Sequence, residues 1–252
     1  MKELVYDYKE RKEKVEEILD NTDGVNEVKQ FPRDEDFTYT NGYKAWASAI
    51  FIDLRDSTSL FTKKDDVEIS KVIRGFTSEI IEILRRELDG NELKEIGIRG
   101  DCVFAVYSTP VKDDIYEIAS RSFYVNTYMK MLNILLEERG LPSIKAGIGL
   151  STSVTLAVKA GRKSSGINNL VWIGKSVATA AKLSDLGNKN GVGPIVMSSL
   201  FYNNMIDIQI NKNAKKDVKS WYTKANDAKF GDYYHANITK TEFNEWITNG
   251  MK

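Results

Sequence analysis

Cysteine and histidine are almost absent from this sequence of 252 residues, which contains one of each. The single cysteine, Cys102, excludes an internal disulfide and is typical of proteins in a reducing compartment. Nothing near Cys102 in the sequence would activate its thiol, so we assign it to core packing. The single histidine, His235, lies in a polar C-terminal segment. No Ser/His/Asp arrangement is available, so a histidine-based hydrolase is not expected.

An excess of charge of either sign is also missing. Lys plus Arg and Asp plus Glu number 36 each, so the formal net charge at pH 7 is zero. Without a basic excess, we expect no nucleic-acid partner. No apolar run approaches the roughly 20 residues that cross a bilayer, and the N-terminal residues lack the apolar core of a secretion signal. We therefore expect a soluble, cytoplasmic protein with no membrane partner, long enough to bury a large core.

The apolar pattern divides the chain into three parts. Residues 1–42 predict a charged helix and a polar linker, residues 43–200 a mixture of strands and helices, and residues 201–252 short strands and a final helix. The order strand, helix, hairpin, helix, strand favours an α+β or α/β sandwich around one central sheet. The expected strands are 44–53, 92–99, 102–107, 143–150, 154–160, 195–197, 206–210 and 230–235, and the expected helices are 2–20, 66–88, 115–139, 177–186 and 240–248.

Two short segments carry the clearest chemical signal. The segments 51–58 (FIDLRDST) and 98–105 (IRGDCVFA) each place one aspartate, Asp53 or Asp101, at the end of an apolar, strand-like run. A lone aspartate in such a position is more often a turn or cap residue. Two carboxylates on rigid strands that share a groove, however, form a hard oxygen site for Mg²⁺ or Mn²⁺, the ions that handle phosphates. The pair therefore predicts a two-metal enzyme that acts on a nucleoside triphosphate.

The turn after Asp53 offers further donors for a triphosphate. Arg55, Ser57 and Thr58 precede a predicted helix, whose first N–H groups favour anions. We expect these three residues to contact the substrate.

Further motifs resemble class III nucleotidyl cyclases over about residues 44–200. They are KAGIG at 145–149 and WIGKSVATAAKL at 172–183. The block KAGRKSSG at 159–166, which runs into NLVWIG at 169–174, is more specifically similar to the pyrimidine cyclases of Pycsar antiphage systems. The resemblance implies a ferredoxin-like α+β sandwich with a central, mostly antiparallel sheet and flanking helices.

The resemblance also implies roles for individual residues. Asp53, Asp101 and the backbone carbonyl of Leu54 would hold two Mn²⁺ or Mg²⁺ ions per site. Lys182 stands where the family usually has an arginine that stabilises the transition state, and lysine keeps the charge but not the bidentate geometry. In the family the metal-binding aspartates come from one subunit, and the residue that stabilises the transition state comes from the other. The resemblance therefore implies a head-to-tail homodimer with composite active sites.

Other positions depart from the family pattern or carry less specific signals. Ala178 replaces an asparagine that usually orients the ribose, and Thr179 or Ser176 are the alternatives for that contact. Candidate phosphate or dimer contacts, or equally a solvated face, are the basic residues Lys159, Arg162 and Lys163.

The usual contacts to adenine are missing. Adenylyl cyclases place a lysine four residues before the second metal aspartate and an aspartate three residues before the glycine of the Trp-Gly segment. Here Gly97 and Val171 stand at those positions, and neither side chain forms hydrogen bonds. Arg99 has the same strand parity as Gly97 and only donates, which fits uracil O4 better than the exocyclic amine of cytosine. Trp46 or Trp172 would fill the volume of a purine.

These observations predict a cyclase that converts UTP to 3′,5′-cyclic UMP and pyrophosphate by attack of the ribose 3′-hydroxyl on the α-phosphate. CTP, ATP and GTP stay open as substrates, because core packing explains both tryptophans equally well and Arg99 can instead pair with Glu95 or Glu92. From another class, a catalytically degenerate, dimeric nucleotide sensor is the alternative, with Ala178 as its sign. Resemblance further implies a second messenger that acts on a cyclic-nucleotide-responsive effector in phage defence.

Overall fold

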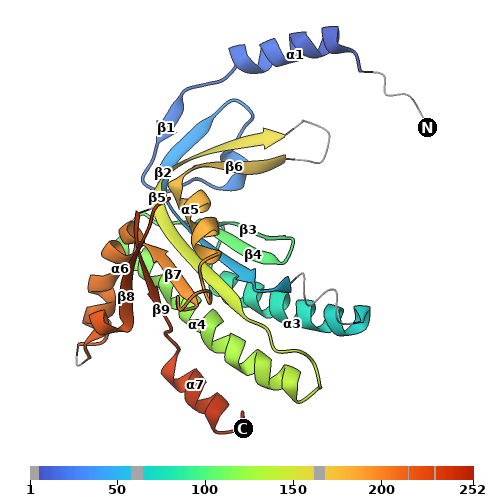
Figure 1. The fold of residues 1–252 in the computed structure, drawn as a ribbon. Coiled ribbons are helices and arrows are strands. Elements are labelled where there is room, and N and C mark those ends of the chain that lie inside the picture. The colour runs from blue at the N-terminus through green and yellow to red at the C-terminus, as the bar shows by residue number, and fades with distance from the viewer. Residues whose placement is uncertain (1–5, 58–64, 162–167, 215, 230) are drawn as a thin grey trace.

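One nine-stranded sheet runs through the residues that the structure describes (Figure 1). The structure is a computed structural model and describes residues 6–57, 65–161, 168–214, 216–229 and 231–252. All strand pairs are antiparallel except β1–β2 and β5–β7. The strands are β1 (Val25–Glu27), β2 (Gly42–Leu54), β3 (Leu93–Arg99), β4 (Cys102–Ser108), β5 (Ala146–Gly161), β6 (Asn168–Gly174), β7 (Ile195–Ser198), β8 (Tyr222–Asp227) and β9 (Gly231–Ala236), in the order β3-β4-β2-β5-β7-β9-β8, with β1 on β2 and β6 on β5.

Helices cover both faces of this sheet. Even-numbered residues of β2, such as Ile50 and Ile52, pack with α3 and α4 in the larger core, whereas odd-numbered residues, such as Ala49 and Phe51, pack with α5 in a smaller one. The period of two along a strand therefore decides which side chains share the α5 face. The helices are α1 (Tyr8–Asp20), α3 (Asp66–Arg85), α4 (Lys112–Glu137), α5 (Lys175–Ser184), α6 (Ser199–Lys212) and α7 (Thr241–Thr248), with 3₁₀ turns η1 (Asp34–Asp36) and η2 (Val218–Trp221).

The predicted α+β sandwich with a mostly antiparallel sheet and flanking helices is confirmed. The last part of the chain extends the same sheet, because β9 pairs with β7 and β8 pairs with β9. Within the described ranges, no helix has both the length and the apolar character needed to cross a bilayer.

The predicted break between two strands near residue 151 is wrong, because β5 is continuous from Ala146 to Gly161. Ser151 and Thr152 are buried rather than exposed in a turn. The hydroxyl of Thr152 donates to the carbonyl of Ala47 (3.1 Å) and accepts from Ser48 (3.0 Å) on the neighbouring strand. Because these hydroxyls find partners across the sheet, the Ser/Thr segment stays in the ladder.

The predicted strand at 206–210 is also wrong, because these residues belong to α6. Ser198 caps this helix by accepting a hydrogen bond from the backbone N–H of Phe201. The β-branched residues of the segment favour a strand by propensity. Burial at helical spacing overrides that preference, and the buried residues are Phe201, Tyr202, Met205, Ile206 and Gln209.

The N-terminal part differs from expectation in two ways. The charged helix forms as α1, but it has no buried residue and stands apart from the sheet (Figure 1). The segment 21–42, predicted to be a polar linker, contributes β1 to the sheet edge and buries Phe31 and Phe37 in the smaller core. These two aromatic residues anchor a segment whose other residues are largely polar.

Candidate active site

The two predicted metal ligands lie at the same edge of the sheet. Asp53 is near the end of β2, where it pairs with Cys102, and Asp101 occupies the turn between β3 and β4 directly before Cys102. Gly100 has a φ of +65°, which lets the chain reverse within two residues. Burial raises the pKa of Asp53, the Arg55 guanidinium opposes this rise, and the charge of Asp101 adds to it. The pairing of Asp53 with Cys102, the residue directly after Asp101, brings the two aspartates to the same end of the sheet.

The donor set at this edge fits a hard divalent cation. Mg²⁺ is commonly held by one or two carboxylates together with substrate phosphates, not by a complete cage of protein side chains. Among the described residues, no group of three or more His, Cys, Asp or Glu side chains is arranged to hold a metal by itself. Leu54, the predicted backbone ligand, ends β2 with its side chain buried in the larger core.

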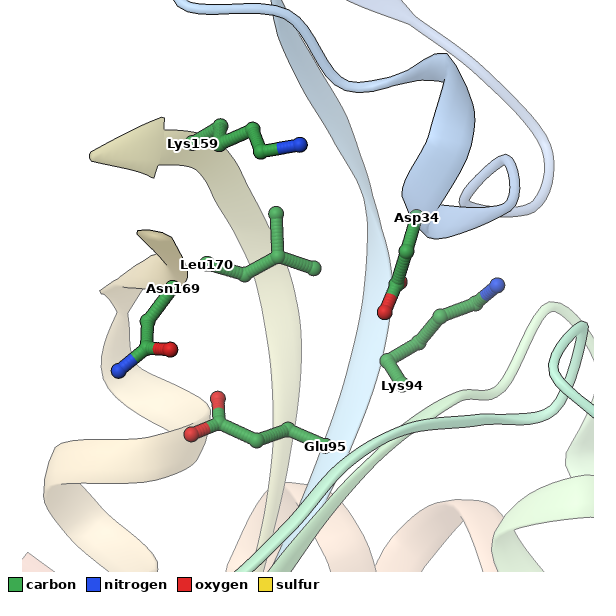
Figure 2. Close-up of a pocket in the computed structure, with 6 residues that line it drawn as sticks. All are labelled: Asp34, Lys94, Glu95, Lys159, Asn169 and Leu170. Atoms are coloured by element: carbon green, nitrogen blue, oxygen red, sulfur yellow. The ribbon is translucent and has the colours of Figure 1, made fainter. Parts of the chain in front are cut away.

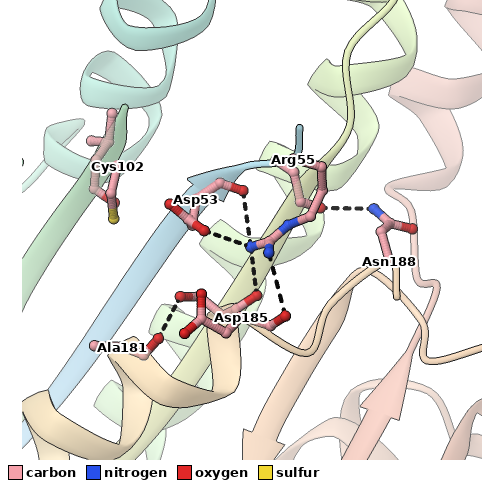
Figure 3. Close-up of polar contacts among 9 residues, drawn as sticks. Asp53, Arg55, Cys102, Ala181, Asp185 and Asn188 are labelled. Carbon is pink, nitrogen blue, oxygen red and sulfur yellow. Dashed lines mark hydrogen bonds and ion pairs between the residues drawn. The ribbon is translucent and has the colours of Figure 1, made fainter. Parts of the chain in front are cut away.

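Arg55 points into the protein (Figure 3). One of its terminal nitrogens, Nη2, donates to Oδ2 of Asp53 (2.8 Å) and to the carbonyl of Ser184 (2.7 Å). The other, Nη1, donates to the carbonyl of Asp185 (3.3 Å). The guanidinium thus lies between the first carboxylate and the end of α5, whereas the sequence prediction placed it on the triphosphate. Ser57, directly after the turn, is half-buried, and Thr58 lies outside the described residues.

Helix α5 lies unusually close to the sheet. A Cβ atom at Gly147 would fall 2.1 Å from the carbonyl oxygen of Ser184, and one at Gly149 would fall 2.0 Å from that of Ala180. The two glycines of the KAGIG motif therefore permit the contact between backbones. Lys182 is exposed on this helix.

The residues around Lys182 limit the choices for ribose binding. Ala178, one turn earlier, is exposed, and Thr179 is half-buried. Ser176 is fully buried, and its hydroxyl forms a hydrogen bond of 2.8 Å with that of Thr155. Of the two alternatives suggested by the sequence, Thr179 is the more accessible.

An aromatic floor lies next to the carboxylates on the α5 face. Phe51 and Phe104 are partners across β2 and β4, with ring centroids 5.3 Å apart and nearly parallel planes. A Cβ at Gly97 would come within 2.9 Å of the Phe104 ring, so the position of this ring favours a residue without a side chain at position 97. The exposed guanidinium of Arg99 lies 5.5 Å from the centroid of Phe104. This aromatic pair was not predicted from the sequence, although the register of β2 and β4 sets the two phenylalanines opposite each other.

Trp46 is separated from the carboxylates within one chain. It precedes Asp53 by seven residues on β2, or about 23 Å at the rise of an extended strand, and has the opposite parity. Its side chain lies instead beside Thr109, Pro110 and Ile115 of the α4 side. The structure therefore does not bring Trp46 together with the other candidate residues of the same subunit.

Trp172 belongs to the core side of β6. Its ring meets Phe31 edge-on with centroids 5.2 Å apart, and its indole N–H donates to Oε2 of Glu95 (2.6 Å). The carboxylate of Glu95 is therefore bound by Trp172. Burial raises the pKa of Glu95, whereas the hydrogen bond from Trp172 and the charge of Arg99 oppose this rise. The predicted packing role of Cys102 is also confirmed, because the thiol contacts the smaller core and burial raises its pKa to about 12.

A small cavity of about 160 Å³ lies beside Glu95 (Figure 2). Lys159 lines it from β5, near the start of β2 rather than near Asp53, and its ammonium donates to the carbonyl of Phe37 (3.3 Å). Arg162 and Lys163, the other candidate contacts of the basic loop, lie outside the described residues.

Replacing Trp172 by phenylalanine is expected to lower the free energy of unfolding by about 1–2 kcal/mol, because the half-buried carboxylate of Glu95 would lose its donor. Urea denaturation would measure the change. In a Glu95→Gln background the same substitution should cost less, since an uncharged amide is easier to leave unpaired. Equal costs in both backgrounds would contradict the assigned hydrogen bond.

Comparison with known proteins identifies two close relatives, although no protein-family model matches the chain. A uridylate cyclase from Treponema porcinum is 44% identical over 248 residues, which cover 98% of this chain and 83% of that protein. A uridylate cyclase from Gulbenkiania mobilis is 29% identical over 249 residues, which cover 96% of this chain and 95% of that protein.

The fold also has relatives among solved structures. The adenylyl cyclase CyaB from P. aeruginosa aligns with a TM-score of 0.61 at 16% identity, over 79% of this chain and 97% of that one. At this level of identity the likeness concerns the fold alone, which is the class III cyclase sandwich expected from the sequence.

Proposed function

This chain belongs to the uridylate cyclase family, and from that premise we propose that it converts UTP to 3′,5′-cyclic UMP and pyrophosphate. The observation that carries the proposal is the pair Asp53 and Asp101 at one sheet edge. Beside them lie the stacked rings of Phe51 and Phe104, with the guanidinium of Arg99 over the Phe104 ring. The ribose 3′-oxygen forms a new bond to the α-phosphorus while the bond to the β-phosphate breaks. The hydroxyl proton passes to solvent, and pyrophosphate leaves with the electron pair of the broken bond.

The residues divide this chemistry between them. Asp53, Asp101 and the carbonyl of Leu54 hold divalent cations, two Mg²⁺ or Mn²⁺ per site in our proposal. When bound, these ions lower the pKa of the attacking hydroxyl and neutralise charge on the phosphates. Lys182, supplied by the second subunit of a head-to-tail homodimer, stabilises the charge that develops on the α-phosphate. The exposure of Lys182 on α5 supports this composite arrangement. We expect the hydroxyls of Ser57 and Thr58 to contact the triphosphate, as the sequence predicts.

The direct test incubates the purified protein with each of the four ribonucleoside triphosphates and Mn²⁺, and identifies the products by mass spectrometry. Cyclic UMP should be the main product. Cyclic CMP or cyclic AMP as the main product would overturn the substrate assignment. Tight binding of a nonhydrolysable UTP analogue without release of pyrophosphate from UTP would indicate a nucleotide sensor instead.

Replacing Arg99 by alanine is expected to reduce the preference for UTP over CTP by about tenfold or more. In our proposal the guanidinium donates to O4 of uracil, and cytosine has an amino group at that position, which does not accept this hydrogen bond. The ratio of kcat/KM for the two nucleotides measures the effect. The exposed neighbour Ile98 is of opposite strand parity, so Ile98→Ala provides the matched control. An unchanged ratio in Arg99→Ala would remove Arg99 from base recognition.

The proposal extends to the cellular role. Cyclic UMP made in the cytoplasm would act on a cyclic-nucleotide-responsive effector during phage infection, in keeping with the Pycsar-like block at 159–174. Cells that carry the enzyme and its effector should accumulate cyclic UMP after infection, and the Asp101→Asn variant should abolish both accumulation and protection.

A further inference from the structure

The side chain of Arg55 connects two segments of one subunit that are far apart in sequence and that contribute to different composite sites of the proposed dimer. Its guanidinium binds the Asp53 carboxylate on β2 and, about 130 residues later, the last carbonyls of α5, at Ser184 and Asp185 (Figure 3). We propose that Arg55 is a positioning residue that fixes the first metal ligand and locks it to the helix that carries Lys182. This inference rests on the proposed cyclase function.

The geometry requires a guanidinium. Carbonyl oxygens at a helix C-terminus lack intrahelical donors and form the negative end of the helix dipole, so a cation is favourable there. The planar fork of arginine donates in two directions at once, toward the carboxylate and toward the helix. A lysine ammonium on a similar stem is a single point and lacks this fixed geometry.

The surroundings are shaped around this side chain. Arg55 is 7% exposed. A Cβ at Gly147 would come within 2.7 Å of Nη2 of Arg55, so glycine leaves the space that the guanidinium occupies. The Nε of Arg55 is buried without a partner in the described residues, although an unpaired buried donor is costly. Among the described residues, the hydrogen bonds of this guanidinium are therefore made by its two terminal nitrogens.

The charges around Asp53 explain what Arg55 prevents. Asp101 and Asp185 both act on the Asp53 carboxylate with like charge, and the end of α5 presents further negative dipoles. Without the guanidinium between them, Asp53 would turn away from Asp185 and from α5. Its oxygens would then leave the orientation in which Arg55 holds them.

Two effects should follow from the loss of the fork in Arg55→Lys. The Mn²⁺ concentration for half-maximal activity should rise about tenfold or more, as for other residues that orient metal ligands through hydrogen bonds. The kcat should also fall, because α5 would no longer hold Lys182 in its position for the composite site. The KM for UTP should change little.

The chain provides a matched control in Arg121. Its guanidinium also binds the end of a helix, through the carbonyls of Ile83 and Arg86 (2.7 and 2.9 Å), and its Nε is also buried without a partner in the described residues. Arg121→Lys therefore removes the same kind of helix brace away from Asp53. We expect it to lower the Tm as Arg55→Lys does, without changing the dependence on Mn²⁺.

Mn²⁺ binding, followed by electron paramagnetic resonance in the presence of a nonhydrolysable UTP analogue, tests the inference separately from turnover. Weaker Mn²⁺ binding in Arg55→Lys but not in Arg121→Lys supports it, even if the wild-type product is not cyclic UMP. Equal Mn²⁺ binding and equal metal activation in both variants would overturn it. Arg55→Gln replaces Arg55→Lys if the latter does not fold. Failure of both to fold would assign Arg55 a purely structural role and overturn the inference as well.

Discussion

Replacing either Asp53 or Asp101 by asparagine is expected to lower kcat by roughly a thousandfold or more, since the variant would lose about 4 kcal/mol of transition-state stabilisation with its cations. The fold should survive. Burial raises the pKa of Asp53 in the folded state, so the ionised form opposes folding at neutral pH. A neutral amide removes that penalty and can still accept a hydrogen bond from Arg55.

Initial rates with UTP and Mn²⁺, together with thermal melting, would measure both effects. Asp56→Asn is the matched control, because Asp56 is exposed in the turn after β2 and has a φ of +54°, which asparagine tolerates well. This control should keep its activity. If either test variant retained more than about a tenth of wild-type kcat, its carboxylate would not be an essential metal ligand.

Mixing Asp53→Asn subunits with Lys182→Met subunits is expected to restore about a quarter of wild-type activity, although each homodimer alone is inactive. In a composite site the carboxylates come from one subunit and the lysine from its partner. Random association makes half of the dimers mixed, and each mixed dimer has one intact site of two. Co-expression with two affinity tags would isolate the mixed dimer, and this purified dimer should have about half of the wild-type activity.

The control mixture combines Asp53→Asn with Asp101→Asn. Both substitutions fall in the same half of a composite site, so each site of the mixed dimer lacks one carboxylate and no activity should return. Recovery in this control would contradict the composite arrangement. So would a mixed dimer of Asp53→Asn and Lys182→Met that forms but stays inactive.

The convergence of Asp53 and Asp101 could be predicted from the sequence because it depends on local signals. A buried strand ends at Asp53, and a two-residue turn at Gly100 sets Asp101 at the end of a hairpin. The parity of Trp46 was also available, since an odd spacing from Asp53 on one strand places the two side chains on opposite faces. That parity alone separates the Trp46 side chain from the Asp53 side chain of the same strand.

The contacts of Arg55 could not be predicted in the same way. They depend on how closely α5 approaches β5, and the signal for that approach is the pair of glycines at 147 and 149. Glycines at a spacing of two have several explanations in a sequence. The continuous β5 and the helical α6 were missed for a related reason, because buried partners across the sheet and along the core override the local preference of Ser/Thr and isoleucine residues.

The tight reversal at Gly100 and the brace on Asp53 have a shared thermodynamic consequence. The turn at Gly100 restricts the backbone on which Asp101 sits. The Asp53 carboxylate is held by the guanidinium of Arg55 without any bound ion. Ligands that are ordered in advance lose little entropy on binding. That entropic cost is therefore met when the chain folds, so cation and nucleotide encounter a preorganised pair of carboxylates.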